Sequence, residues 1–339
     1  MLFAENNNSV VSNRRTSRKM DLSEYVRHNE LWYNDGSMVL LAEKHAFRVH
    51  IDILVQQSDV FADMFEIARD PPAFTTDNQP ILELPEKWQD VLCALMFIYH
   101  ARRYMQERMP FSVLRSLLHM GRKYNIEEMG YDAENYLYKR YPRTLAAHVN
   151  PPFHKTIDVE ESADGVHSIA IVKLAREFDM PWILPLAFYE CALLPLETLF
   201  SGTTDSTDTH WSLEEDDIRR VVKGREDLVM RRHKQLAVFV TPFQINLSEH
   251  CRTKDICREE IKEVGQAFYH EWETECRPAV LAPLQVRLNG FCMCEPCTKM
   301  YLDEYDGHRR DLWNALVRVF ELQDELGETE WKGELEDDD

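Results

Sequence analysis

Cysteines are the residues of this chain whose spacing most clearly suggests chemistry. Six of the eight cysteines fall within residues 251–297. Cys294 and Cys297 are separated by two residues, a spacing that lets one turn aim both sulfurs at a single metal ion. Cys251 and Cys257 can supply a second pair, although the five residues between them are more than usual. The simpler interpretation is that they are small, buried hydrophobic side chains. A structural zinc site at these four cysteines is the alternative.

His50 is the second candidate for chemistry, because it ends an alternating apolar and polar run, AFRVH, at residues 46–50. A catalytic histidine needs a base, a nucleophile or a metal partner, and the neighbouring sequence offers only Asp52. The simpler interpretation is a packed histidine whose ring nitrogens are hydrogen-bonded within the fold. The sequence contains neither GxSxG nor HExxH, and neither of the common glycine-rich phosphate motifs. We therefore expect no catalytic residues, no organic cofactor and no enzymatic activity.

The composition restricts the partners. The chain has 39 Lys and Arg against 59 Asp and Glu, a formal net charge of −20 that repels the phosphate backbone of nucleic acids. No apolar run approaches the roughly 18 residues of a membrane span. The first thirty residues contain no apolar core of signal-peptide length. We expect a protein of the cytoplasm or nucleus that is not secreted, keeps its cysteines reduced, and binds neither nucleic acid nor membrane.

The elements that would position these residues divide into two groups. The first contains a hairpin over residues 37–50, a helix capped by Ser58 and a short strand at 81–84, followed by helices. Because strands come first and helices follow, this part is predicted to be an α+β domain. Its later helices are expected at residues 88–99, 111–124 and 129–137.

Beyond Tyr141-Pro142 the pattern indicates helices and no further strands. Ser162 is a plausible cap for the first of these helices, and Gly224 is the expected break in a long one over 213–240. Residues 201–210 are predicted to be a polar loop. The other helices are expected near residues 166–178, 182–189 and 300–320.

The order of elements in the first group, together with specific residues, resembles the BTB/POZ family. The shared pattern is Phe47 to His50, then Ile53-Leu54, Ser58, Phe61 and Met64-Phe65. The strand ILEL, the helix that begins at Trp88 and the later stretch LLHMGRKYNI also fit. The wording DGSMVLLAEKHAFRVH is most similar to the expanded BTB proteins of basidiomycete fungi.

Composition, periodicity and the resemblance together give a domain plan: a disordered leader at residues 1–28, a BTB/POZ domain at 29–141, a mostly α-helical region at 142–330 and an acidic tail at 331–339. The implied fold is a short β-sheet flanked by a helical cluster. The implied function is protein–protein interaction through a homodimer or heterodimer. A substrate adaptor for a cullin-type ubiquitin ligase and a zinc-stabilised structural scaffold are the alternatives.

One departure from the family concerns the dimer. Better-known transcriptional members carry an Asp and a basic residue that face each other in a charged pocket at the dimer, and these positions are Ser37 and Ile51 here. Because both charges are missing together, neither is left buried without its partner, and the fold is not threatened. The charged pocket itself is not expected in this chain. The residues predicted to contribute to a partner interface are Leu22, Tyr25, Val26 and Ile51.

Overall fold

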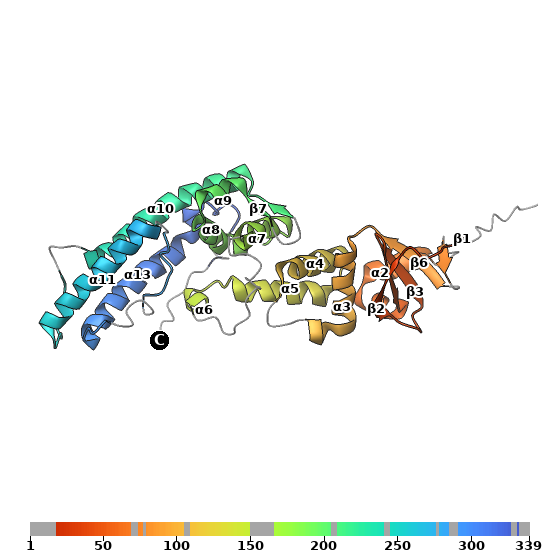
Figure 1. Cartoon of the computed structure of the whole chain (residues 1–339), viewed down its shortest axis with the longest axis horizontal. Coiled ribbons are helices and arrows are strands. Elements are labelled where there is room, and N and C mark those ends of the chain that lie inside the picture. Colours follow the sequence, from red (N-terminus) through yellow and green to blue (C-terminus); the bar gives the residue numbers. More distant parts are fainter. Residues whose placement is uncertain are drawn as a thin grey trace, which may run out of the picture. The chain divides into compact units, whose positions relative to one another are not determined.

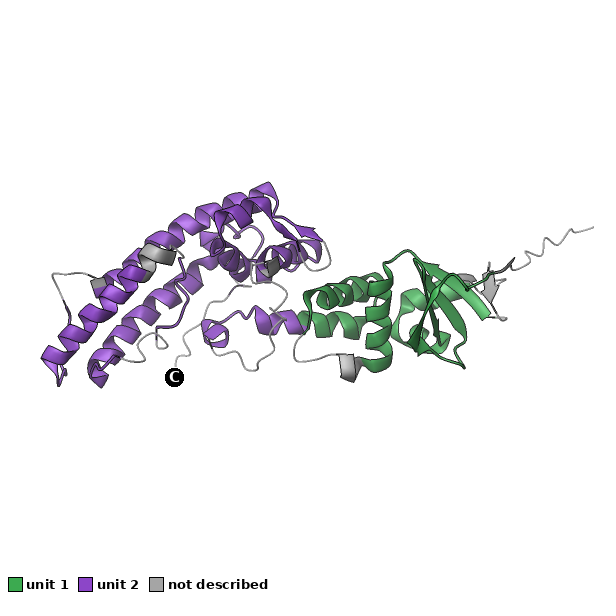
Figure 2. Cartoon of the chain, in the orientation of Figure 1, with its two compact units in different colours: residues 1–134 green, residues 135–339 purple. Residues whose placement is uncertain are grey.

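The protein was analysed as a computed structural model. The chain divides into two compact units, residues 1–134 and 135–339, which are coloured separately in Figure 2. The described residues are 18–68, 74–76, 79–104, 109–149, 166–204, 209–240, 245–275, 278–284, 291–326 and 331.

A six-stranded sheet forms the first half of the N-terminal unit (Figure 1). The apolar strand Met38–Ala42 is buried at every position, because it lies between two neighbours in the middle of the sheet. It pairs antiparallel with His45–Val49, which confirms the predicted hairpin, and parallel with Gln79–Leu84. The strand order is β1-β5-β6-β3-β4-β2. The bounds are β1 Arg18–Lys19, β2 Val26–Trp32, β3 Met38–Ala42, β4 His45–Val49, β5 Phe74–Thr76 and β6 Gln79–Leu84.

Helices complete this unit, as the sequence predicted, and the fold class is confirmed. Ser58 begins the second helix: its hydroxyl accepts the backbone N–H of Phe61 at 3.0 Å and donates to the carbonyl of Tyr124. One side chain thus caps a helix and ties it to the end of another. The bounds are α1 Ile51–Gln57, α2 Asp59–Ala68, α3 Trp88–Tyr104, α4 Phe111–Lys123 and α5 Glu127–Arg140, the last of which crosses the division between the units.

Strand β2 begins at Val26, inside the segment expected to be a disordered leader. Leu22, just before it, is buried against Val39 and Leu41 of β3. The sequence signal was weak because β2 is an edge strand with mostly exposed side chains, so its alternation is largely polar. The ordered part of the chain therefore starts earlier than the sequence indicated.

The C-terminal unit is mostly helical. Among its described residues there is one strand pair, β7 with β8, in which two residues from each side pair antiparallel. It overlaps the predicted polar loop and extends to Trp211, so the prediction of no strands beyond Pro142 is wrong here. Ser162 lies outside the described residues. The bounds are α6 Leu145–Val149, α7 Val166–Glu177, a 3-10 turn Pro181–Ile183, α8 Leu184–Ala192, α9 Leu196–Ser201, β7 Thr203–Thr204, β8 His210–Trp211, α10 Glu215–Val240, α11 Lys254–Glu275 and α13 Glu295–Val319.

Helix α10 continues through Gly224, so the predicted break there is wrong. A Cβ at this position would overlap the ring of Phe320, which follows α13. The glycine is therefore explained by the close approach of an aromatic ring, which leaves no room for a side chain. Trp331, expected in the acidic tail, is buried and donates its indole N–H to the carbonyl of Trp313 at 3.2 Å.

Helices α10, α11 and α13 share one hydrophobic cluster (Figure 1). This cluster positions the beginnings of α11 and α13 relative to each other. None of the described helices is long and apolar enough to cross a membrane. The buried members of the cluster are Leu236, Phe239, Ile261, Val264, Phe268, Leu284, Tyr301 and Tyr305.

Candidate functional site

The structure brings together the four cysteines that the sequence singled out as metal ligands. Cys251 lies in the turn before α11, and Cys257 lies in the first turn of that helix. Cys294 is the N-cap of α13, and Cys297 lies in its first turn, after Pro296 at the start of the helix. The cluster therefore forms where two helices begin.

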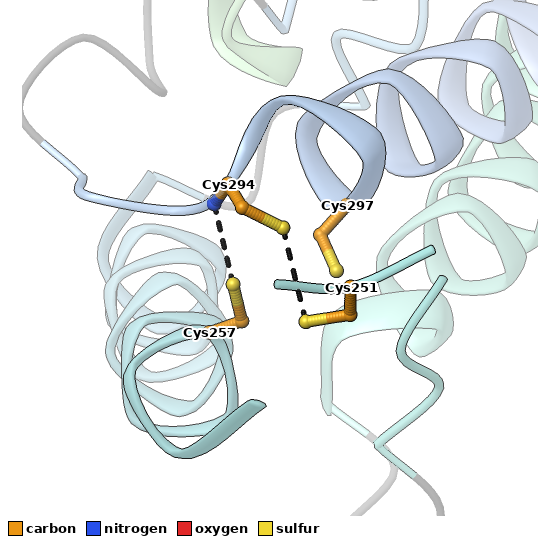
Figure 3. A group of neighbouring side chains, drawn as sticks. All are labelled: Cys251, Cys257, Cys294 and Cys297. Carbon is orange, nitrogen blue, oxygen red and sulfur yellow. Dashed lines mark hydrogen bonds between the residues drawn. The ribbon is translucent and has the colours of Figure 1, made fainter. Parts of the chain in front are cut away.

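The four sulfurs point toward one another, as Figure 3 shows. All of them lie within 4.8 Å of one another. The Sγ atoms of Cys251 and Cys294 are 3.8 Å apart, too far for a disulfide bond of about 2.05 Å. Four thiols this close can surround one tetrahedral ion.

Backbone N–H groups surround the same sulfurs. The N–H of Cys294 donates to the sulfur of Cys257 at 3.2 Å, drawn as a dashed line in Figure 3. Hydrogen bonds from N–H groups favour the negatively charged form of a thiol. Every sulfur of the cluster accepts at least one: Cys251 from Thr253, Cys257 from Cys294, Cys294 from Arg252 and Cys297, and Cys297 from Ser248.

These surroundings act unequally on the thiols. The hydrogen bond from the backbone of Arg252 lowers the pKa of Cys294 to about 6. Burial raises the pKa of Cys297 to about 12 and also raises the pKa of Cys251. Four thiolates at this separation would repel one another unless a cation neutralised them. The arrangement is thus suited to a metal cation that binds sulfur ligands. The four thiols include no separate general base.

Of the two other cysteines in this part of the sequence, Cys292 is described, and it is exposed and outside the cluster. Cys276 lies outside the described residues. The cluster thus contains the four cysteines that the spacing favoured, out of the six within residues 251–297.

His50 is held by neighbours within the N-terminal unit. Its Nδ1 atom lies 3.1 Å from the hydroxyl of Tyr99, which also accepts the backbone N–H of His50 at 2.9 Å. Its Nε2 atom lies 3.3 Å from a carboxylate oxygen of Asp35. Both ring nitrogens therefore have partners, which is the arrangement expected of a packed histidine.

Comparison with known families identifies part of the N-terminal half of the chain. The sequence of residues 35–141 matches the family model of the BTB/POZ domain. This part of the chain is a BTB/POZ domain. BTB/POZ domains are protein–protein interaction modules rather than enzymes. A search of curated proteins found no match to the chain. The closer resemblance to basidiomycete proteins stays a prediction.

Ser37 and Ile51, at which no charged dimer pocket was expected, lie next to each other. The hydroxyl of Ser37 accepts the backbone N–H of Ile51 at 2.9 Å. This N–H belongs to the first turn of α1, where helix donors have no partner within the helix. Here a hydroxyl satisfies that donor, so the two positions remain in contact without any charge.

The other predicted interface residues have different surroundings. Leu22 is buried within its own BTB domain, and Tyr25 is partly buried against the same cluster. Val26 is 53% exposed on the edge strand β2. Packing within the chain therefore occupies Leu22 and most of Tyr25, and leaves Val26 and half-buried Ile51 accessible.

Helix α1 carries a further candidate, Val55, and Ile53 of the family pattern lies on the same short helix. Leu54 is its only buried residue, whereas Ile51, Ile53 and Val55 are half-buried. A helical wheel would have indicated apolar side chains outside the buried face, because three β-branched apolar residues in seven cannot all share the face of Leu54.

Proposed function

We propose that this chain is a non-enzymatic interaction protein whose BTB domain binds a second copy of the chain. The mostly helical C-terminal unit would be presented to a further protein partner. A heterodimer with a related BTB chain is the closest variant of this proposal. We place the protein in the cytoplasm or nucleus, where its thiols stay reduced.

The observation that carries the proposal is the apolar surface of α1. Ile51 and Val55 are one helical turn apart and lie on the same side of the helix. Both remain partly exposed, whereas Ile53, two residues from each, points to the other side of the helix and is not part of this surface. Burial of apolar surface is the main source of association energy, and a partner that covered α1 would recover it. Absence of a charged pocket makes apolar contact the main attraction available here.

The experiment measures the mass of the purified full chain by light scattering after gel filtration. We expect a species of twice the 40.0 kDa chain for the natural protein. The variant with both Ile51→Lys and Val55→Lys should be monomeric, because two charges would have to lose water on association. Tyr131→Lys is the matched control, since Tyr131 is a 70% exposed residue on α5 of the same unit.

Circular dichroism should show the same helix content in all three proteins. A natural chain that stays monomeric at the highest concentrations reached would refute the self-association. A double lysine variant that remains dimeric would exclude α1 as the interface. If the mass doubles only when a second BTB protein co-purifies, the proposed homodimer would have to be replaced by a heterodimer.

A substrate adaptor for a cullin-type ubiquitin ligase is the second candidate. It requires an exposed face on α3 and α4, where Val113 and His119 of α4 are half-buried. Affinity purification from the native cell followed by mass spectrometry tests it directly. Co-purification of a cullin, lost on charge substitution at Val113, would favour this role.

A further inference from the structure

We propose that Cys251, Cys257, Cys294 and Cys297 bind one structural Zn²⁺ ion, which joins the beginning of α11 to the beginning of α13. The proposal concerns the C-terminal unit alone and goes beyond the proposed interaction function. Neither depends on the other.

The sulfur positions fit a single tetrahedral ion. A Zn–S bond of about 2.3 Å places neighbouring sulfurs of a tetrahedron about 3.8 Å apart. The Sγ atoms of Cys251 and Cys294 have this separation, 3.8 Å, and no pair in the cluster exceeds 4.8 Å. Shifts of about 1 Å at most would therefore complete the tetrahedron.

Backbone N–H donors and the N-termini of two helices converge on the four sulfurs. Each sulfur accepts a backbone N–H, and Cys294 accepts two. Two helices also begin at the cluster, and the positive end of a helix dipole favours negative charge. Cysteines that serve only as hydrophobic side chains have no need of convergent donors, and Cys251 and Cys294 are only half-buried.

Burial of apolar surface accounts for only part of the order of this region: Ile245, Leu247, Phe291 and Met293 pack against the hydrophobic cluster but stay partly exposed. None of the residues 245–256 and 291–296 is buried, and all of them are described. The first buried residues on each side are Cys257 and Cys297 themselves. The nearest buried members of the hydrophobic cluster are Ile261 and Tyr301, one turn further along each helix. A metal ion would add a direct cross-link between the two segments to these partly buried contacts.

The ligand set indicates a structural role. Four thiolates fill all four positions of a tetrahedral zinc ion, so no position remains for water or a substrate. Thiolate ligands also select zinc over calcium and magnesium, which prefer oxygen. Lewis-acid catalysis needs an open position, and this site would not offer one.

The first experiment measures the metal content of the full chain purified under reducing conditions without chelators. We expect one zinc per chain, and a loss of that zinc in the double variant with Cys294→Ser and Cys297→Ser. Cys292→Ser is the matched control: Cys292 lies two residues from Cys294, is exposed, and should leave the zinc content unchanged.

A second measurement keeps the test decisive if the double variant fails to fold. The natural chain, stripped of metal and kept reduced, is titrated with Co²⁺ alone. The proposal expects saturation at one equivalent, with the intense visible bands and sulfur-to-metal charge-transfer bands of tetrahedral cobalt thiolate. Zn²⁺ should displace the cobalt and abolish these bands.

Three results would overturn the proposal. The first is a folded, reduced chain without stoichiometric metal and without a cobalt thiolate spectrum. The second is zinc that persists in a folded double variant, or is lost in Cys292→Ser to the same degree. The third is stoichiometric iron in place of zinc, or disulfides among the four cysteines in protein purified without oxygen.

Discussion

At the scale of single residues, the BTB domain depends on a buried carboxylate. Glu86, two residues before the start of α3, is 6% exposed. It accepts a hydrogen bond from the hydroxyl of Tyr124 at 2.7 Å and forms an ion pair with Lys123, the last residue of α4. Burial by itself would raise the pKa of Glu86, but the hydrogen bonds from Lys123 and Tyr124 outweigh it and hold the pKa below its usual value.

This residue predicts a pH-dependent contribution to stability. Because the pKa of Glu86 is lower in the folded chain than in the unfolded chain, its contribution is complete above the unfolded pKa. The contribution is lost as pH falls through the folded pKa. Near pH 7, Glu86→Gln should lower the free energy of unfolding by about 1–3 kcal/mol. Near pH 3, the difference from the natural chain should be much smaller.

Urea unfolding followed by circular dichroism at both pH values measures this difference. Glu83→Gln is the control, because Glu83 is an exposed carboxylate on β6, three residues earlier in the chain. Equal losses from the two substitutions, or a loss from Glu86→Gln that grows as the pH falls, would contradict the assignment.

At the scale of secondary-structure elements, α10 shows that a glycine in a long helix need not break it. Arg232 and Gln235 of this helix are buried, and their side chains are hydrogen-bonded to each other at 2.7 Å. Arg232 also donates to the hydroxyl of Tyr305, and Gln235 donates to the carbonyl of Val280. These bonds fasten α10 to α13 and to the segment 278–284, while Gly224 permits the close approach of Phe320.

Two glycines in helices of the same unit therefore predict opposite results. Alanine is preferred to glycine inside a helix by about 1 kcal/mol. Gly307→Ala in α13 should raise the free energy of unfolding by about this amount, because a Cβ there meets nothing within 4 Å. Gly224→Ala should lower the free energy of unfolding by about 1–3 kcal/mol, because its Cβ would overlap the ring of Phe320.

Thermal unfolding of both variants beside the natural chain tests this pair of predictions. Gly224→Ala with an unchanged or raised melting temperature would show that the Phe320 ring moves aside without cost. A double variant with Phe320→Leu should recover part of the loss from Gly224→Ala, because the smaller side chain leaves room for the methyl group.

At the scale of the whole molecule, the two units divide the proposed roles. The BTB domain carries the partly exposed α1 surface, and the C-terminal unit carries the cysteine cluster. The α1 surface is proposed to act between chains, and the cysteine cluster within one chain. A change at the cluster should therefore affect stability without affecting assembly.

Removal of zinc tests that separation. A strong chelator under reducing conditions should lower the melting temperature of the natural chain, because binding to the folded state alone stabilises that state. The same treatment should leave the mass measured by light scattering unchanged. Dissociation of the dimer on chelation would show that the two roles are coupled.

The sequence by itself determined the local features of this protein. The hairpin, the Ser58 cap and the C-x2-C spacing depend on residues close together in the chain, so alternation, capping and ligand spacing reveal them. Tertiary structure decided the rest. The place of β2 at the edge of the sheet, the reason for Gly224 and the convergence of Cys257 with Cys294 all join segments far apart in sequence. Periodicity reports which side of an element is apolar, but only packing selects the residues that meet there.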